Sequence, residues 1–213
     1  MNLRVSAITA IILFLFGSIG AGLVAFTYEN TRERIAANER ETLLRKLHVL
    51  ITPERHDNDL FEDTLMIRDA GPLGTQAPVA AYRARKEDHP VALILAPVAP
   101  DGYSGSIRLL VGINYDGTLA GVRVVAHRET PGLGDGIEED RSDWIYGFDG
   151  LSLENPPAEY WVVKKDGGRF DQLTGATITS RAVVKAVRKS LLYYRAHRAE
   201  LFASDGQETT GQP

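Results

Sequence analysis

The chain has 213 residues, no cysteine, and 24 lysines and arginines against 28 aspartates and glutamates, which gives a formal net charge of −4. This mildly acidic balance argues against nucleic acid as a main partner, and the lack of cysteine excludes disulfides, thiolate metal sites and iron–sulfur ligation by this chain. With 44% hydrophobic residues, the length supports one sizeable domain with its own core, plus a membrane anchor.

The first predicted element is a transmembrane helix over residues 6–28, a stretch without any charged residue. At about 1.5 Å per residue it can cross a hydrocarbon core of about 30 Å. We expect a single pass, with the tail at residues 1–5 in the cytoplasm and the large domain on the other side. Cations flank both ends, so the positive-inside rule orients the segment only weakly. The alternative is a cleaved signal peptide, whose apolar core is normally shorter, about 7–15 residues.

A juxtamembrane helix is predicted next, over residues 29–52. Leu43, Leu47 and Leu50 recur at helical spacing among charged residues, and Pro53 ends the pattern. We expect this helix to act as a spacer that rests on the domain. The domain itself is predicted to extend over residues 53–203.

Within the domain, the stretch up to residue 78 is mixed and loop-like because glycine and proline interrupt it. Two predicted antiparallel hairpins follow, formed by residues 79–85 with 91–96 and by residues 107–115 with 118–126. The dipeptide Asp116-Gly117 is a strong signal for the second turn.

The last third of the chain starts with a loop rich in glycine and acid, over residues 131–150. A further short strand is predicted at residues 160–163, and a C-terminal helix from about Arg181 to Phe202. The polar tail at residues 204–213 is predicted to be disordered. The predicted fold class is therefore α+β: a transmembrane helix, then one mixed α/β domain with antiparallel hairpins and a C-terminal helix.

Residues 174–180 read Thr-Gly-Ala-Thr-Ile-Thr-Ser and stand directly before the predicted C-terminal helix. The first N–H groups of a helix have no partner inside it and favour a phosphate. Arg181 and Lys185 place cations near the positive end of the helix dipole, which indicates that an external anion occupies the site. The alternative is an ordinary Thr-Ser N-cap, although no Glu or Gln follows at the capping-box position.

Three motifs together resemble one family. Residues 174–180 resemble the Ser/Thr-Gly-Ala-Thr/Ser-x-Thr motif of the FMN-binding domain found in the RnfG proteins of the Rnf electron-transport complex and in the related flavoprotein of the sodium-pumping NADH:quinone reductase. Residues 127–134 resemble the Glu-Thr-Pro-Gly-Leu-Gly loop of that domain, and residues 102–107 are a third match, all in the family's order. The shortness of the chain favours the RnfG proteins, with the quinone-reductase flavoprotein as the alternative.

The resemblance implies that FMN is attached covalently, with its phosphate esterified to Thr179. It also implies that the loop after His127 lies against the isoalloxazine ring, with Glu129 and Thr130 near the polar edge of the ring; the alternative for this loop is a plain surface loop. The implied cofactor-binding residues are Thr174, Gly175, Ala176, Thr177, Thr179, Ser180, Glu129, Thr130, Gly132 and Leu133.

The resemblance further implies an electron-relay subunit of a ferredoxin:NAD+ oxidoreductase that translocates ions across the bacterial inner membrane, with the flavin domain in the periplasm. Implied partners are the other subunits of the Rnf complex, membrane lipid, and a separate flavin transferase that uses FAD and Mg²⁺. No independent catalytic site is expected, because the sequence shows no nucleophile–base pair. The five scattered histidines suggest no metal site. The alternatives are a membrane-anchored assembly module without redox activity and a stand-alone flavoprotein outside the cytoplasm.

Overall fold

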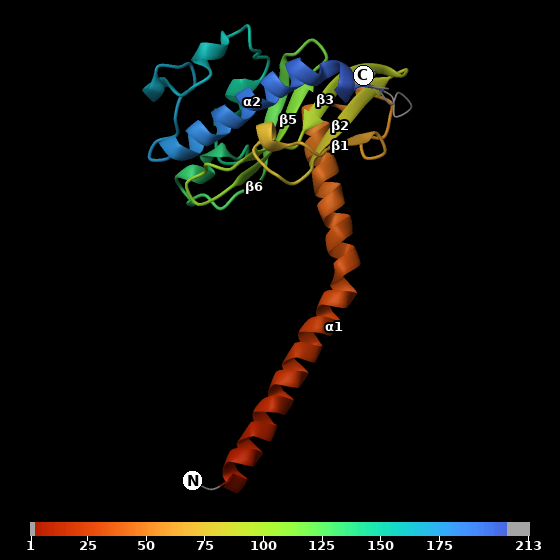
Figure 1. Ribbon diagram of the computed structural model, residues 1–213, viewed down its shortest axis with the longest axis vertical. Helices are drawn as coiled ribbons and strands as arrows, with labels where there is room; N and C mark the ends of the chain where they lie inside the picture. The colour runs from red at the N-terminus through yellow and green to blue at the C-terminus, as the bar shows by residue number, and fades with distance from the viewer. Residues whose placement is uncertain (1–2, 204–213) are drawn as a thin grey trace, which may run out of the picture. The chain divides into compact units, whose positions relative to one another are not determined.

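The computed structural model describes residues 3–203 of the chain (Figure 1). The predicted disordered tail at residues 204–213, and the first two residues of the predicted cytoplasmic tail, lie outside this range. The described chain divides into two compact units between Arg45 and Lys46, and each unit is considered by itself. Helix α1 (Leu3–Leu50) supplies the whole described part of the first unit and the beginning of the second.

In the first unit, α1 is one continuous helix where two separate helices were predicted. Neither glycine nor proline occurs between residues 23 and 50, so the change from apolar to charged composition near residue 28 does not interrupt the backbone. In the apolar N-terminal part of α1, large side chains such as Phe14, Phe16 and Leu23 are exposed. By length and composition, α1 is a candidate membrane span.

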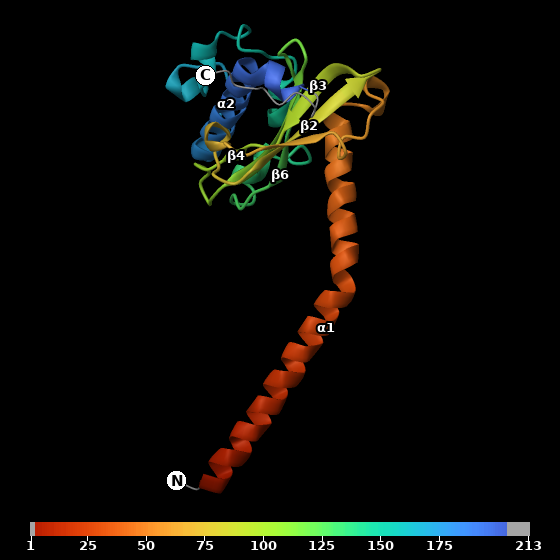
Figure 2. The same cartoon turned by 45° about the vertical axis from the view of Figure 1, so that its right-hand side comes forward.

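The second unit is built on an antiparallel sheet of six strands in the order β1-β2-β3-β5-β4, with β6 paired to β5 (Figures 1 and 2). The strands are β1 (Thr64–Ile67), β2 (Val79–Lys86), β3 (His89–Leu95), β4 (Val98–Ala99), β5 (Ile107–Asn114) and β6 (Leu119–Ala126). Both predicted hairpins form, as β2–β3 and β5–β6. The α+β prediction is confirmed. The short strands β1 and β4 were not predicted.

Helix α2 (Thr177–Leu201) lies across one face of the sheet and contacts β4 and β5 (Figure 2). Its buried face includes Val183, Val187, Leu191 and Tyr194, which recur every three or four residues as on any amphipathic helix. These side chains join the strand residues in one core. The sheet and α2 thus form two layers, and the N-terminal end of α2 is held in a fixed place beside the sheet.

The end of α1 that belongs to the second unit packs on a glycine pair in the sheet. Gly112 of β5 and Gly121 of β6 are register partners. A Cβ atom at either position would lie 3.3 or 3.1 Å from Leu50, so the missing side chains let Leu50 approach the backbone closely. The Lys46 ammonium donates to the Val124 carbonyl at 2.5 Å and so binds the open edge of β6.

Between β6 and α2 the chain forms short 3₁₀ helices: η3 (Gly134–Ile137), η4 (Asp143–Phe148), η5 (Ala158–Tyr160) and η6 (Lys164–Asp166). Two more, η1 (Pro53–Arg55) and η2 (Gly71–Leu73), lie before β2. The predicted strand at residues 160–163 is wrong: η5 ends there, and Val163 makes one isolated bridge to Phe170. The apolar run is explained by core packing, because Trp161 is buried against Phe148 and Phe170.

Candidate functional site

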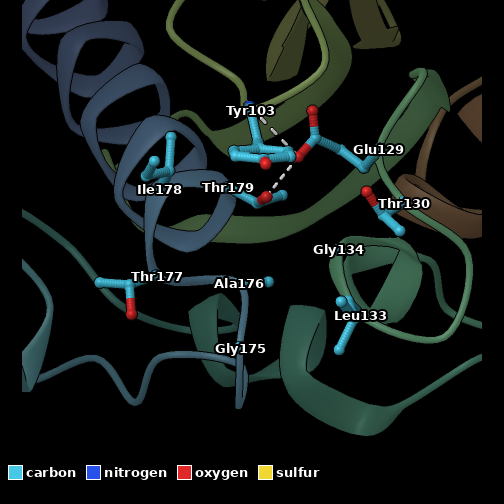
Figure 3. A pocket seen from close by; sticks show the side chains of 10 residues that line it. All are labelled: Tyr103, Glu129, Thr130, Leu133, Gly134, Gly175, Ala176, Thr177, Ile178 and Thr179. Atoms are coloured by element: carbon cyan, nitrogen blue, oxygen red, sulfur yellow. Dashed lines mark hydrogen bonds between the residues drawn. The ribbon is translucent and has the colours of Figure 1, made fainter.

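A cavity of about 470 Å³ opens where the start of α2, the loop after β6 and the turn before β5 meet (Figure 3). This volume is within the range usual for small-molecule sites. Its lining residues come from three separate stretches of sequence: Tyr103; Glu129, Thr130, Leu133 and Gly134; and Gly175, Ala176, Thr177, Ile178 and Thr179.

Helix α2 begins earlier than predicted, at Thr177 instead of about Arg181. The chain reverses at Gly175, whose φ of +77° suits glycine, and Ala176 precedes the first helical residue. Thr179 is therefore the third residue of the helix. The alternative of an ordinary Thr-Ser N-cap is wrong, because Ala176 holds the N-cap position and no side chain caps the helix there. Ser180 instead accepts from the Leu173 N–H at 3.0 Å and donates to the Ala176 carbonyl at 3.1 Å, which fixes the turn before the helix.

The Thr179 side chain points to a buried carboxylate, Glu129 (Figure 3). Thr179 is 1% exposed and Glu129 4% exposed, and the Thr179 hydroxyl donates to Glu129 Oε2. The backbone N–H groups of Tyr103 and Ser104 also donate to this carboxylate, at 3.3 and 2.9 Å. A buried carboxylate needs such donors to offset its lost hydration. Three separate parts of the chain are thereby joined at Glu129.

His127 positions Glu129 from the far side, which the sequence did not suggest. Its Nδ1 lies 3.0 Å from the backbone nitrogen of Glu129 and accepts that N–H. Its Nε2 lies 3.0 Å from Glu138 Oε1. Since Nδ1 acts as an acceptor, a neutral ring carries its proton on Nε2 and donates it to Glu138. The two ring nitrogens of His127 thus connect the start of the loop after β6 to Glu138, farther along the same loop.

Two glycines leave the space that Glu129 needs. A Cβ atom on Gly134 would lie 2.8 Å from Glu129 Cβ and 3.1 Å from the Thr179 hydroxyl oxygen. A Cβ atom on Gly102 would lie 2.2 Å from the Gly105 carbonyl and 2.9 Å from Glu129 Oε1. Both glycines allow a close approach that any other residue would disturb. Gly134 in the motif at residues 127–134 and Gly102 in the motif at residues 102–107 therefore leave room for the Glu129 carboxylate.

The two cations near the start of α2 are paired with acids, so their position alone does not indicate an external anion. Arg181 donates to both oxygens of Asp166, at 2.6 and 2.8 Å, and this hydrogen bonding lowers the pKa of Asp166. Lys185 binds Asp101 and lowers the pKa of that carboxyl in the same way. Any anion at the cavity would have to be held by backbone N–H groups and hydroxyls.

The structure separates the predicted site residues into two groups. Those that line the cavity are Glu129, Thr130, Leu133, Gly175, Ala176, Thr177 and Thr179. Those that do not line it are Thr174, Gly132 and Ser180. Gly132 instead makes a turn at φ +77°. Three lining residues were not predicted as site residues: Tyr103, Gly134 and Ile178.

The rim of the cavity is apolar and exposed. Tyr103, Leu133 and Ile178 are 67, 49 and 46% exposed although each carries a large apolar group. Exposed apolar side chains gathered around a cavity are typical of a site for an apolar or aromatic ligand. Within residues 3–203, no three histidine, aspartate or glutamate side chains lie close enough together to hold a metal ion. The arrangement offers an apolar rim, a buried hydroxyl and the free N–H groups of a helix start.

Comparison with known proteins shows which family the part of the chain around the cavity belongs to. Residues 102–192 match the FMN-binding domain family, and residues 1–50 match the RnfG N-terminal region. The chain is 44% identical over 204 residues to the subunit designated G of the ion-translocating oxidoreductase complex of Pseudoalteromonas atlantica, covering 96% of this chain and 95% of that protein. It is 50% identical over 196 residues to the equivalent protein of Pseudomonas aeruginosa, covering 92% of each.

Proposed function

The chain belongs to the RnfG family of ion-translocating oxidoreductase complexes, as its motifs predicted, and on that basis we propose that it is a flavin-bearing electron relay in such a complex. The observation that carries the proposal is the buried Thr179 hydroxyl on the wall of the cavity, inside the part of the chain that matches the FMN-binding domain. The similarity of the N-terminal region to RnfG favours this over the flavoprotein of a quinone reductase.

We propose that the FMN is covalent, with its phosphate esterified to Thr179. The residues present fit this group. The start of α2 supplies backbone N–H groups that have no partner inside the helix, which suits a phosphate. The exposed Tyr103, Leu133 and Ile178 side chains suit a planar aromatic ring. Thr177 lines the same cavity but is not buried as Thr179 is, so Thr179 is the better candidate for the linkage.

When bound, FMN supplies the electron-transfer chemistry, and the chain supplies binding and orientation. Tyr103, Leu133 and Ile178 would exclude water from part of the ring, and the cavity is open at the surface. An open site lets a neighbouring redox centre approach. We propose that this protein has no independent catalytic site for electron transfer.

We also propose its partners: the other subunits of a ferredoxin:NAD+ oxidoreductase, membrane lipid around α1, and a flavin transferase that attaches the FMN.

The proposal is tested by intact mass. The full chain, produced in cells together with a flavin transferase and purified in detergent, is expected to carry one FMN less one water, and its denatured band is expected to fluoresce under ultraviolet light. A chain produced without the transferase is the control and should show the bare mass. A bare chain in both preparations would favour the alternative, a membrane-anchored assembly module without redox activity.

We also propose that α1 anchors the chain in the bacterial inner membrane with its N-terminus in the cytoplasm and the flavin domain in the periplasm. The natural chain has no cysteine, so one exposed cysteine reports topology without background. Lys165→Cys, at an exposed position in η6, is expected to react with a membrane-impermeant maleimide in intact spheroplasts. The cysteine-free parent is the control. Labelling that requires lysis of the spheroplasts would place the domain in the cytoplasm.

A further inference from the structure

The Thr179 hydroxyl is already hydrogen-bonded to a base. Its proton points to Glu129 Oε2, and both groups are buried at the inner wall of the cavity (Figure 3). We propose that Glu129 is the general base that accepts the Thr179 proton when the flavin is attached. This inference rests on the proposed covalent FMN. It replaces two sequence-based expectations: that Glu129 lies near the polar edge of the flavin ring, and that the chain has no nucleophile–base pair.

A threonine hydroxyl is a weak nucleophile unless an adjacent group takes its proton. A general base must lie within hydrogen-bond reach of the proton it abstracts, and Glu129 meets that condition in the protein before any flavin is bound. The base therefore belongs to the acceptor chain itself. A transferase would then only have to present its flavin dinucleotide and Mg²⁺ to a hydroxyl that is already activated.

The surroundings of Glu129 orient it for this role. The Ser104 N–H holds Oε1 at 2.9 Å, while Oε2 receives the Thr179 hydroxyl and the more distant Tyr103 N–H at 3.3 Å. With one oxygen fixed by the backbone, the other is directed at Thr179. The absent side chains of Gly102 and Gly134 allow the carboxylate to lie there. A carboxylate that only tied the turn to the loop would not need to be directed at a hydroxyl in a cavity.

The step balances as follows. The Thr179 oxygen forms a bond to the FMN-side phosphorus of the flavin dinucleotide. The bond from that phosphorus to the bridging oxygen breaks, and AMP leaves with this oxygen. The Thr179 proton goes to Glu129. No oxidation or reduction occurs. Glu129 need not be regenerated, because each chain is modified once.

The test follows attachment by intact mass over time, with full-length apo-protein in detergent, purified transferase, FAD and Mg²⁺. Glu129→Gln keeps the shape of the side chain but removes the base, and its rate is expected to be roughly 10²-fold lower than that of the parent, the low end for loss of general-base catalysis. Glu159→Gln is the control, because it removes an exposed carboxylate of η5 that does not line the cavity. Its rate is expected to equal that of the parent.

A pH series separates a base from a structural tie. The ratio of parent to Glu129→Gln rates is expected to fall as pH rises, because hydroxide increasingly replaces the missing base, while Glu129→Asp keeps a carboxylate and should show a constant ratio. Equal rates for parent and Glu129→Gln, or a Glu129→Gln ratio that does not change with pH, would overturn the base role. A parent chain that acquires no FMN would overturn the proposed function and this inference together.

Discussion

Replacing Thr179 by alanine is expected to abolish covalent flavin while the fold persists. The substitution removes the one oxygen at which we propose the ester forms. It also removes one of the donors to the buried Glu129 carboxylate, so the free energy of unfolding should fall by about 1–3 kcal/mol. Intact mass and in-gel fluorescence measure the flavin, and urea unfolding in detergent measures stability.

Thr177→Ala is the matched control for this prediction. Thr177 has the same side chain, belongs to the same motif and lines the same cavity two residues earlier, but it is only half-buried. Its alanine variant should keep the full FMN mass. Flavin retained by Thr179→Ala, or lost from Thr177→Ala alone, would show that the linkage is assigned to the wrong threonine.

The two hairpins and the α+β class could be predicted from sequence because their signals are local. Asp116-Gly117 lies between two alternating strands, and the pairing of β5 with β6 follows from that turn alone. The strand predicted at residues 160–163 failed for the opposite reason. Trp161 is apolar because it fills the core beside Phe148 and Phe170, and a single sequence does not distinguish such packing from a buried strand.

The candidate site shows the same limit. The motif residues were identifiable, and most of them line one cavity. The start of α2 was placed four residues late, because the hydroxyls of Thr179 and Ser180 are typical of positions just before a helix. The Glu129–Thr179 hydrogen bond joins positions 50 residues apart, and no spacing rule predicts such a contact. The ion pairs that neutralise Arg181 and Lys185 are equally non-local.

Replacing Gly102 by alanine is the second change for which we expect a large effect. The new Cβ atom would lie 2.2 Å from the Gly105 carbonyl, which is backbone and cannot rotate away. The turn must therefore shift, and with it the Tyr103 and Ser104 N–H groups that hold Glu129. We expect unfolding free energy to fall by roughly 1–3 kcal/mol, as for an overpacked core, and flavin attachment to slow together with it.

Gly147→Ala separates this effect from the general cost of replacing a glycine. Gly147 lies in η4, and a Cβ atom there would meet no described atom within 4 Å. The Gly147→Ala variant should have the same free energy of unfolding and the same rate of flavin attachment as the parent. If Gly102→Ala also behaved like the parent in both measurements, the turn before β5 would not be what holds Glu129 against Thr179. If Gly102→Ala lost stability but kept the parent rate of attachment, Glu129 would be positioned by His127 and the loop after β6 alone.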